Sequence, residues 1–328
     1  MNPSSTQHLL NHTWFGLIGL MLVLYVVTDG FDLGVGILTL LRGRDSDRDL
    51  MIQSIGHVWD ANETWLVVLG GALFGAFPDA YAMILSDLYV PVMVLIASFI
   101  MRGAAIEFRH SARTGKTLWD RVFGLGSLLA AISQGIVLGK VLTGFMPGGH
   151  SLALVIVTAI GVVSGYCLLG ATWLVKKTTG EIESAARRYA TFAVFTTVIA
   201  AVLVSFATMK FSPVGITRWQ DHGVFDVLIA LAVIAALAFA YVLYSVRMRG
   251  EHGPFVGSTT LFVVSFAGLA ISLFPYIVPG QLTVAAAASD SSTLIFMLFG
   301  IGTVFPIMIA YNLYQYYLFR GKVVAVKH

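Results

Sequence analysis

The residues of this chain that could do chemistry are ionisable side chains embedded in long apolar stretches. Asp29 and Asp32 lie one helical turn apart in the first stretch. Asp60 and Glu63 repeat this spacing at the start of the second, and Arg102 lies near the end of the third. Proton movement requires titratable or hydrogen-bonding groups at short intervals, because each transfer spans only a hydrogen bond. The pattern therefore predicts a proton route or, as the alternative, a set of structural ion pairs.

The second apolar stretch opens with a polar turn. A helix through this turn would place its histidine, its two acids and its threonine on one face. The spacing His57-x2-Asp60-x2-Glu63 resembles a metal-binding face, but a polar turn at the head of a helix is the more ordinary explanation, and we predict no metal site. The predicted intramembrane polar cluster consists of Asp29, His57, Asp60, Glu63, Thr64 and Arg102.

Composition shows what kind of protein must hold these groups. The 328 residues are 57% hydrophobic and 11% charged, with a mean hydropathy of +0.84, whereas soluble domains are about 45–50% apolar and about 25% charged. This excludes a soluble enzyme, a nucleic-acid binder, a disordered protein and a disulfide scaffold. The single cysteine, Cys167, lies in an apolar run and is interpreted as a small core residue. The chain is predicted to be a polytopic membrane protein.

The elements that position the charged groups are apolar runs long enough to cross a membrane, which requires about 20 residues each. We predict an all-α integral membrane protein that forms a single membrane domain over residues 1–328, without a cleaved signal peptide. Residues 42–57 and 176–189 are predicted to be its longest polar connectors. Nine spans are expected, at roughly 14–41, 58–77, 80–108, 122–145, 151–175, 190–210, 223–246, 257–279 and 292–318.

The basic residues predict the orientation of the chain. Sixteen of the 20 lysines and arginines fall in the loops after spans 1, 3, 5 and 7 or in the C-terminal tail. Basic loops stay in the cytoplasm. The N-terminus is therefore expected outside and the C-terminus in the cytoplasm of a bacterial inner membrane.

Chain direction then predicts the depth of each charged group. At about 1.5 Å per residue, Asp29 lies near the centre of the membrane, whereas Asp60 and Arg102 lie roughly 10–12 Å to the cytoplasmic side. Glu63 falls between these levels. The carboxyl groups would form a ladder from the cytoplasmic surface to the middle of the membrane, as a water-lined proton route requires.

Two uses of this ladder stay open. Ionisable residues are costly inside a membrane and indicate function by default. Arg102 could hold Asp60 ionised while Asp29 and Asp60 conduct protons. Alternatively, an Asp60–Arg102 pair could simply fix the helices in register, and the two roles are compatible.

The other residues of these motifs are given structural or interfacial roles. Near the headgroups, as solvated or snorkelling side chains, we place Asp32, Glu107 and Arg109. Aromatic anchors are Trp59, Trp65 and a C-terminal belt that includes Tyr316. Close helix approach is assigned to Gly30, Gly34 and Gly36.

The positions of the histidines argue against a haem or copper site inside the membrane in this chain. All of them fall outside or at the edges of the spans: His8, His12, His57, His110, His150, His222, His252 and His328. No pair could clamp a haem or copper ion in mid-membrane. The sequence also lacks a P-loop, a dinucleotide-binding glycine motif and a Cys-x-x-Cys pair.

Several of these motifs resemble subunit II of the cytochrome bd quinol oxidases. The resemblance rests on Thr28-Asp29-Gly30-Phe31-Asp32-Leu33-Gly34-Val35-Gly36, Trp59-Asp60-Ala61-Asn62-Glu63-Thr64-Trp65-Leu66 and Gly70-Gly71-Ala72-Leu73-Phe74-Gly75-Ala76-Phe77-Pro78. It extends to Arg102, to Glu107-Phe108-Arg109 and to Phe274-Pro275-Tyr276-Ile277-Val278-Pro279. It covers essentially the whole chain, with trimmed loops, and does not separate conventional from cyanide-insensitive members.

The resemblance implies a partner, cofactors and a fold. Subunit II folds as two four-helix bundles plus a peripheral helix and pairs with subunit I, which ligates two haems b and one haem d. The complex oxidises quinol and reduces O2 to water without pumping protons, and subunit II supports haem assembly. The family also implies a structural quinone in some members and allows small single-helix accessory subunits. Asp29, Asp60 and Arg102 match family positions that are linked to a cytoplasmic proton route or to the stability of the haem region.

A proton-coupled secondary transporter is the alternative from another class. Such a protein would also use mid-membrane acids near interrupted helices. It predicts an interrupted span with polar groups in each half of the chain. Gly30, Gly34 and Gly36 supply one such segment, but spans 5–9 offer no partner segment with acids. This asymmetry favours the oxidase subunit.

Overall fold

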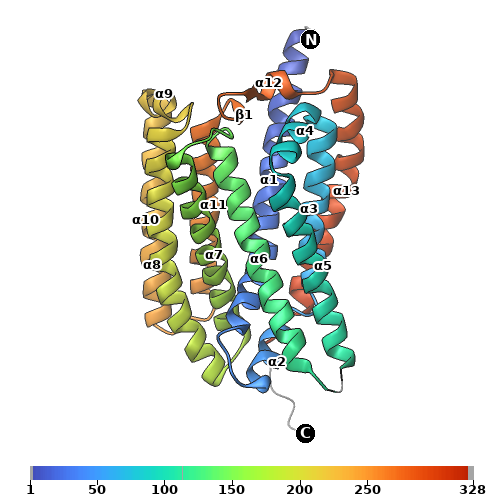
Figure 1. Cartoon of the computed structure of the whole chain (residues 1–328), viewed down its shortest axis with the longest axis vertical. Helices are drawn as coiled ribbons and strands as arrows, with labels where there is room; N and C mark the ends of the chain where they lie inside the picture. Colours follow the sequence, from blue (N-terminus) through green and yellow to red (C-terminus); the bar gives the residue numbers. More distant parts are fainter. Residues whose placement is uncertain (1–2, 113, 324–328) are drawn as a thin grey trace.

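The chain forms a bundle of long helices that run along a common axis (Figure 1). The computed structural model describes residues 3–112 and 114–323. Eight of the described helices are individually long and apolar enough to cross a membrane: α1 (Pro3–Thr39), α5 (Tyr89–Ser111), α6 (Lys116–Leu142), α7 (Gly149–Lys177), α8 (Gly180–Phe211), α10 (His222–Arg247), α11 (Gly253–Leu273) and α13 (Ser291–Leu318). A ninth span is obtained if α3 (Trp59–Ala76) and α4 (Pro78–Asp87), which are bent by 120° to each other, are counted together.

Two predicted spans are wrong in detail. The run 80–108 is not one helix, because α4 ends at Asp87 and α5 begins at Tyr89. The run 257–279 ends as a helix at Leu273, and its last residues form strand β1 (Tyr276–Val278), which pairs antiparallel with β2 (Leu282–Thr283). Ser86 and Asp87 lie at the first break and Pro275 and Pro279 at the second, but hydropathy averaged over a span does not respond to so few residues.

The two polar connectors are also more helical than predicted. Residues 42–57 contain the short helix α2 (Asp45–Gln53), which lies at the end of the bundle where α13 finishes (Figure 1). Within 176–189 only Thr178 and Thr179 are non-helical, because α7 continues to Lys177 and α8 already begins at Gly180.

Prolines and caps explain several helix boundaries. Pro78 occupies the first turn of α4, where the ring is tolerated but cannot continue a preceding helix. Asp221 caps α10 by accepting a hydrogen bond from the Val224 amide at 3.1 Å. Asp290 caps α13 through the Thr293 amide at 2.8 Å, and hydrogen bonds from Thr293 lower the pKa of Asp290. At the same end, α9 (Gly215–Gln220) and α12 (Val284–Ala287) complete the loops.

Helix α1 runs through the middle of the bundle and contacts α3, α6, α7, α11 and α13. Glycines make its crossings close. A Cβ atom at Gly34 would fall 1.7 Å from the carbonyl oxygen of Tyr166 in α7, and one at Gly36 would fall 2.1 Å from the Ser127 hydroxyl in α6. The backbones can approach only because these side chains are missing. The polar residues of α1 are consequently buried among several helices.

Candidate functional site

The centre of the bundle holds an ionic cluster, which we call the Arg102 cluster: Asp29 and Asp32 of α1, the half-buried Glu63 of α3 and Arg102 of α5. Asp29, Asp32 and Arg102 are 0% exposed. Arg102 Nη2 lies 2.6 Å from Asp29 Oδ1 and 4.0 Å from Asp32 Oδ2, and Nη1 lies 3.9 Å from Glu63 Oε2. Three carboxyl groups thus face one guanidinium inside the apolar part of the bundle.

The cluster continues toward α13 through neutral side chains. The Asn62 amide of α3 donates to Asp32 Oδ2 at 2.8 Å and to the Thr28 carbonyl at 3.3 Å. The Tyr316 hydroxyl of α13 in turn donates to Asn62 Oδ1 at 2.5 Å. Asn62 is therefore held at both ends of its carboxamide, between the buried carboxylate and the tyrosine.

On its other side, the cluster borders a second neutral chain. Tyr25 lies beside Asp29, on the preceding turn of α1. Gln134 of α6 donates to the Tyr25 hydroxyl at 2.9 Å and accepts from the Tyr166 hydroxyl of α7 at 2.5 Å. Polar groups from α1, α3, α5, α6, α7 and α13 are thus joined into one buried network.

Hydrogen bonding within the Arg102 cluster is incomplete. In the described part of the chain, both carboxylate oxygens of Asp29, Asp32 Oδ1 and all three guanidinium nitrogens of Arg102 are buried without a hydrogen-bond partner. The 2.6 Å approach of Arg102 to Asp29 is a close ion pair whose direction is not that of a hydrogen bond. Buried polar atoms of this kind are normally satisfied by water or belong to a reactive site.

The predicted partner of Arg102 is wrong. Within the described residues, the acids near Arg102 are Asp29, Asp32 and Glu63, while Asp60 is exposed on another face of α3. Depth along a span gives the level of a side chain but not the direction in which it points. Asp60 lies close enough to Glu63 to act on it electrostatically.

Two residues that were predicted to be solvated or snorkelling near the headgroups are buried beside ionic partners instead. Asp32 is fully buried beside Arg102, and Arg109 is only 7% exposed because it is bound to Asp120 and Asp49. Glu107 is exposed.

The remaining predicted residues are dispersed. His57 lies in the turn before α3, not on the face of that helix, and stacks on Phe319 with ring centroids 4.3 Å apart. Thr64 is exposed and donates to the Asp60 carbonyl at 3.0 Å. Trp59 is half-buried, whereas Trp65 is 1% exposed.

Sequence reasoning missed five neutral members of the network: Tyr25, Asn62, Gln134, Tyr166 and Tyr316. Asn62 and Gln134 are amides inside apolar helices. Burial of an amide costs free energy unless it is hydrogen-bonded, so their positions in the sequence could have indicated a polar network. Tyr316 was placed in an interfacial belt, but it is half-buried and bound to Asn62. Aromatic residues at the end of a span give no sequence signal that separates these two roles.

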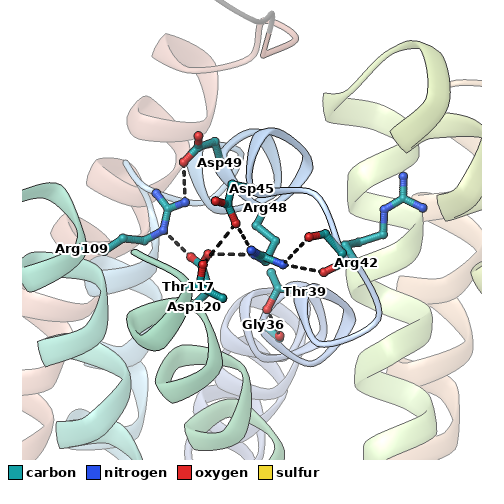
Figure 2. Close-up of polar contacts among 10 residues, drawn as sticks. Gly36, Thr39, Arg42, Asp45, Arg48, Asp49, Arg109, Thr117 and Asp120 are labelled. Atoms are coloured by element: carbon teal, nitrogen blue, oxygen red, sulfur yellow. Dashed lines mark hydrogen bonds and ion pairs between the residues drawn. The ribbon is translucent and has the colours of Figure 1, made fainter. Parts of the chain in front are cut away.

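A second buried network lies at the end of the bundle near α2, and we call it the Asp120 cluster (Figure 2). Asp120 of α6 accepts from Arg48 Nε at 2.8 Å through one oxygen and from Arg109 Nε through the other. Arg48 also donates to Asp45 and to the carbonyls of Arg42 and Gly43, the first of these two at 2.7 Å. Arg109 donates further to Asp49. The Asp120 cluster thereby ties α2, α5 and α6 to the end of α1.

Neither network offers a metal or haem site. The described residues contain no group of three His, Cys, Asp or Glu side chains that could hold a metal ion. The six histidines whose side chains are described, His8, His12, His57, His150, His222 and His252, are exposed. The donor set inside this part of the chain is therefore carboxylate, guanidinium, amide and phenol, which suits protons rather than haem iron.

Comparisons with known proteins agree with the motifs. The model of the family described as cytochrome bd terminal oxidase subunit II matches residues 10–319. Cytochrome bd ubiquinol oxidase subunit 2 of Bacillus subtilis is 29% identical over 338 residues, covering 96% of this chain and 97% of that protein. Cytochrome bd-I ubiquinol oxidase subunit 2 of Escherichia coli K12 is 27% identical over 360 residues, covering 96% and 95%.

The fold is similar as well. A chain in the structure of the bd oxidase from Geobacillus thermodenitrificans superposes with a TM-score of 0.79 at 19% identity, covering 94% of this chain and 99% of that one. The family match spans nearly the whole sequence, and the helices are those of a multi-pass membrane protein. The chain belongs to the cytochrome bd terminal oxidase subunit II family.

Proposed function

We propose that this chain pairs with a haem-bearing subunit I in a complex that oxidises quinol and reduces O2 to water. Family membership and the names of its relatives, which are ubiquinol oxidase subunits, support this role. Two haems b and one haem d would be ligated by subunit I, in keeping with the exposure of the six histidines whose side chains are described. The haems supply electron transfer and oxygen chemistry when bound, and this subunit supports their assembly.

The contribution of the chain itself, in this proposal, is to carry protons from the cytoplasm toward the haems. The observation that carries it is the Arg102 cluster, in which a fully buried guanidinium faces three carboxyl groups. One positive charge cannot compensate the negative charges of two fully buried carboxylates and a half-buried one, and an uncompensated buried charge is very costly. Such a site binds protons, and its unpartnered oxygens give each proton a place to bind.

Uptake would begin at the end of the molecule that carries the basic loops. With the N-terminus outside and the C-terminus in the cytoplasm, as the basic residues indicate, the exposed Asp60 is the outer group and Glu63 leads from it to Arg102. Thr64 and His57 flank this start. Because the protons for water come from the cytoplasm and quinol protons leave outside, charge is separated without pumping.

The proposal includes the grouping of the helices. Helices α1, α3, α5 and α6 would form one four-helix bundle and α7, α8, α10 and α11 the other, with α13 peripheral against α1 and α3. Within these sets α1 packs on α3 and α6, α5 on α6, α7 on α8 and α10 on α11, while α7 joins the two sets through its contacts with α1 and α6. A structural quinone and small single-helix accessory subunits remain part of the family expectation, and no contact in the described chain bears on them.

Family membership leaves the transporter alternative without support. That reading required buried acids in both halves of the chain. In the described residues, the buried carboxyl groups belong to Asp29, Asp32 and Asp120, all in α1 and α6. Helices α7 to α11 carry only acids that are exposed or half-buried.

The test is the Asp29→Asn variant of the whole complex in proteoliposomes. We expect oxygen reduction and proton uptake from the C-terminal side to fall at least about tenfold, because the relay loses an acid. Reduced-minus-oxidised spectra should show the haems retained. Asp226→Asn, which alters an exposed aspartate of α10, is the matched control. Loss of the haems in Asp29→Asn would make this residue structural, and normal proton uptake would remove it from the route.

A further inference from the structure

The end of the bundle where α13 finishes contains a pocket of about 390 Å3, which lies between the turn before α3, the end of α7 and the segment after α13. Its lining consists of Gln53, Ser54, His57, Val58, Trp173, Lys177, Tyr316, Leu318, Phe319, Gly321, Lys322 and Val323. Gln53, His57 and Gly321 are exposed, whereas Ser54 and Val58 are buried, so the pocket runs from the surface inward.

The rim of the pocket is the segment 319–323, which is fixed by Lys177. The ammonium group of Lys177 donates to the carbonyls of Phe319 and Gly321, the latter at 3.3 Å, and the Val323 amide donates to the Lys177 carbonyl at 2.8 Å. The ring of His57 stacks on the ring of Phe319. Lys177 is thereby engaged by carbonyl groups.

The inner wall of this pocket contains Tyr316. Its hydroxyl binds Asn62, and Asn62 binds Asp32, which lies 4.0 Å from Arg102. One carboxamide group therefore separates the pocket wall from the buried carboxylate. One turn away on α13, Asn312 is 8% exposed and keeps its carbonyl oxygen buried without a partner in the described chain. Asp32 Oδ1 is also unpartnered. Polar atoms thus continue from the pocket to the cluster.

We propose that this pocket is a second entrance for protons, through which Tyr316 delivers them to Asp32. We call this path the Tyr316 branch. It rests on the proposed proton role of the Arg102 cluster and adds an entrance on the α13 side, away from Asp60. The ligand of the pocket is water carrying an excess proton, for which the volume and the polar wall are sufficient.

The transfer needs one water molecule besides the groups named, because the Tyr316 hydroxyl donates to Asn62 Oδ1 and makes no direct hydrogen bond to Asp32 in the described chain. The Tyr316 oxygen accepts a proton from a hydronium ion in the pocket, while its own proton leaves Asn62 and passes through that water molecule to the free oxygen of Asp32. The tyrosine ends unchanged, a water molecule remains in the pocket, and the carboxylate becomes a carboxylic acid. Asn62 carries no proton. It is a positioning residue that holds the hydroxyl and the carboxylate at its two ends.

The experiment uses the complete complex in proteoliposomes, in an Asp60→Asn background so that the first entrance cannot mask the second. Tyr316→Phe removes only the hydroxyl. It should slow proton uptake about fivefold and raise the solvent deuterium isotope effect on turnover. Tyr317→Phe, an exposed neighbour on the same helix, is the matched control and should change neither. Equal rates and isotope effects in Tyr316→Phe and Tyr317→Phe would overturn the Tyr316 branch.

A second measurement blocks the pocket without touching the buried network. In a Cys167→Ala background, Gly321→Cys places a thiol on the rim, where a side chain meets no atom within 4 Å. A charged thiol-specific reagent should slow proton uptake in this protein, and a reductant should restore it. The Cys167→Ala complex treated in parallel should not respond. Complete labelling of the cysteine with no change in uptake would contradict the proposal.

The two proposals fail differently. If Asp29→Asn blocks uptake while Tyr316→Phe and rim labelling do not, the Arg102 cluster conducts protons and the Tyr316 branch is wrong. If none of these changes affects uptake, the proton role of the cluster itself is wrong.

Discussion

The Arg102 cluster and the Asp120 cluster are built from the same types of side chain, arginines and acids, but their hydrogen bonding differs. In the Asp120 cluster, each carboxylate oxygen of Asp120 accepts from an arginine, and Arg48 and Arg109 find further acceptors (Figure 2). In the Arg102 cluster, the guanidinium nitrogens and the Asp29 oxygens have no hydrogen-bond partner within the described chain. In the Asp120 cluster two arginines share one central aspartate, whereas in the Arg102 cluster three carboxyl groups share one arginine.

This difference in hydrogen bonding distinguishes a network that stabilises the fold from one that can exchange protons. A saturated buried ion network holds its elements in one arrangement, and breaking it leaves an uncompensated charge. A network with unfilled hydrogen bonds and more acids than bases stabilises the fold poorly, but it can bind and release protons. Burial alone does not distinguish the two, since Asp29 and Asp120 are 0% and 2% exposed. The number of partners does.

The largest effect should come from breaking the saturated network. Asp120→Ala leaves Arg48 and Arg109 facing each other without the shared carboxylate. We expect a loss of about 3–5 kcal/mol in the free energy of unfolding, as for other broken buried ion pairs. Thermal unfolding of the purified complex and its haem content would measure it. A variant as stable as the wild type would show that the Asp120 cluster is not the fastener described here.

The next largest effect is expected at the crossing of α1 and α7. Gly34→Ala adds a methyl group that would meet the Tyr166 carbonyl oxygen at 1.7 Å. Overpacking of this kind costs about 1–3 kcal/mol. Because the helices must separate, the contact of Tyr166 with Gln134 should also weaken. Thermal unfolding measures the cost. Gly71→Ala in α3, where a side chain would meet no atom within 4 Å, is the control.

The smallest effect concerns an exposed contact at the rim of the pocket. A hydrogen bond from Lys322 at 2.8 Å lowers the pKa of Glu251, with smaller contributions from His252 and Arg187. The contact is therefore fully present above the ordinary pKa of a glutamate and is lost as the pH falls through the lowered value. A spin label at Gly321→Cys should gain mobility only in that acid range. In Glu251→Gln, the acid-induced change should disappear.

The motifs predicted the acids of the site better than their partners. Asp29 and Glu63 were placed in the predicted cluster, whereas Asp32, which lies on the same helical stripe as Asp29, was assigned to the headgroup region. The partner of Arg102 was not found, because periodicity along one helix says nothing about how neighbouring helices are rotated. Asn62 lies among apolar helix residues, and this signal was not used, whereas Tyr316 lies in an aromatic run that also fits an interfacial belt. The break between α4 and α5 falls beside Ser86 and Asp87, two polar residues whose effect is lost when hydropathy is averaged over a long apolar run.

The central claim is that the Arg102 cluster exchanges protons during turnover and the Asp120 cluster does not. Redox-induced infrared difference spectroscopy of the whole complex tests it most directly, because a carboxyl group that gains or loses a proton changes its C=O stretching band. We predict such a band in the wild-type complex that is lost or shifted in Asp29→Asn or Asp32→Asn and is unchanged in Asp120→Asn. A carboxyl band that survives replacement of Asp29, Asp32 and Glu63 in turn, or that disappears only with Asp120, would contradict the account.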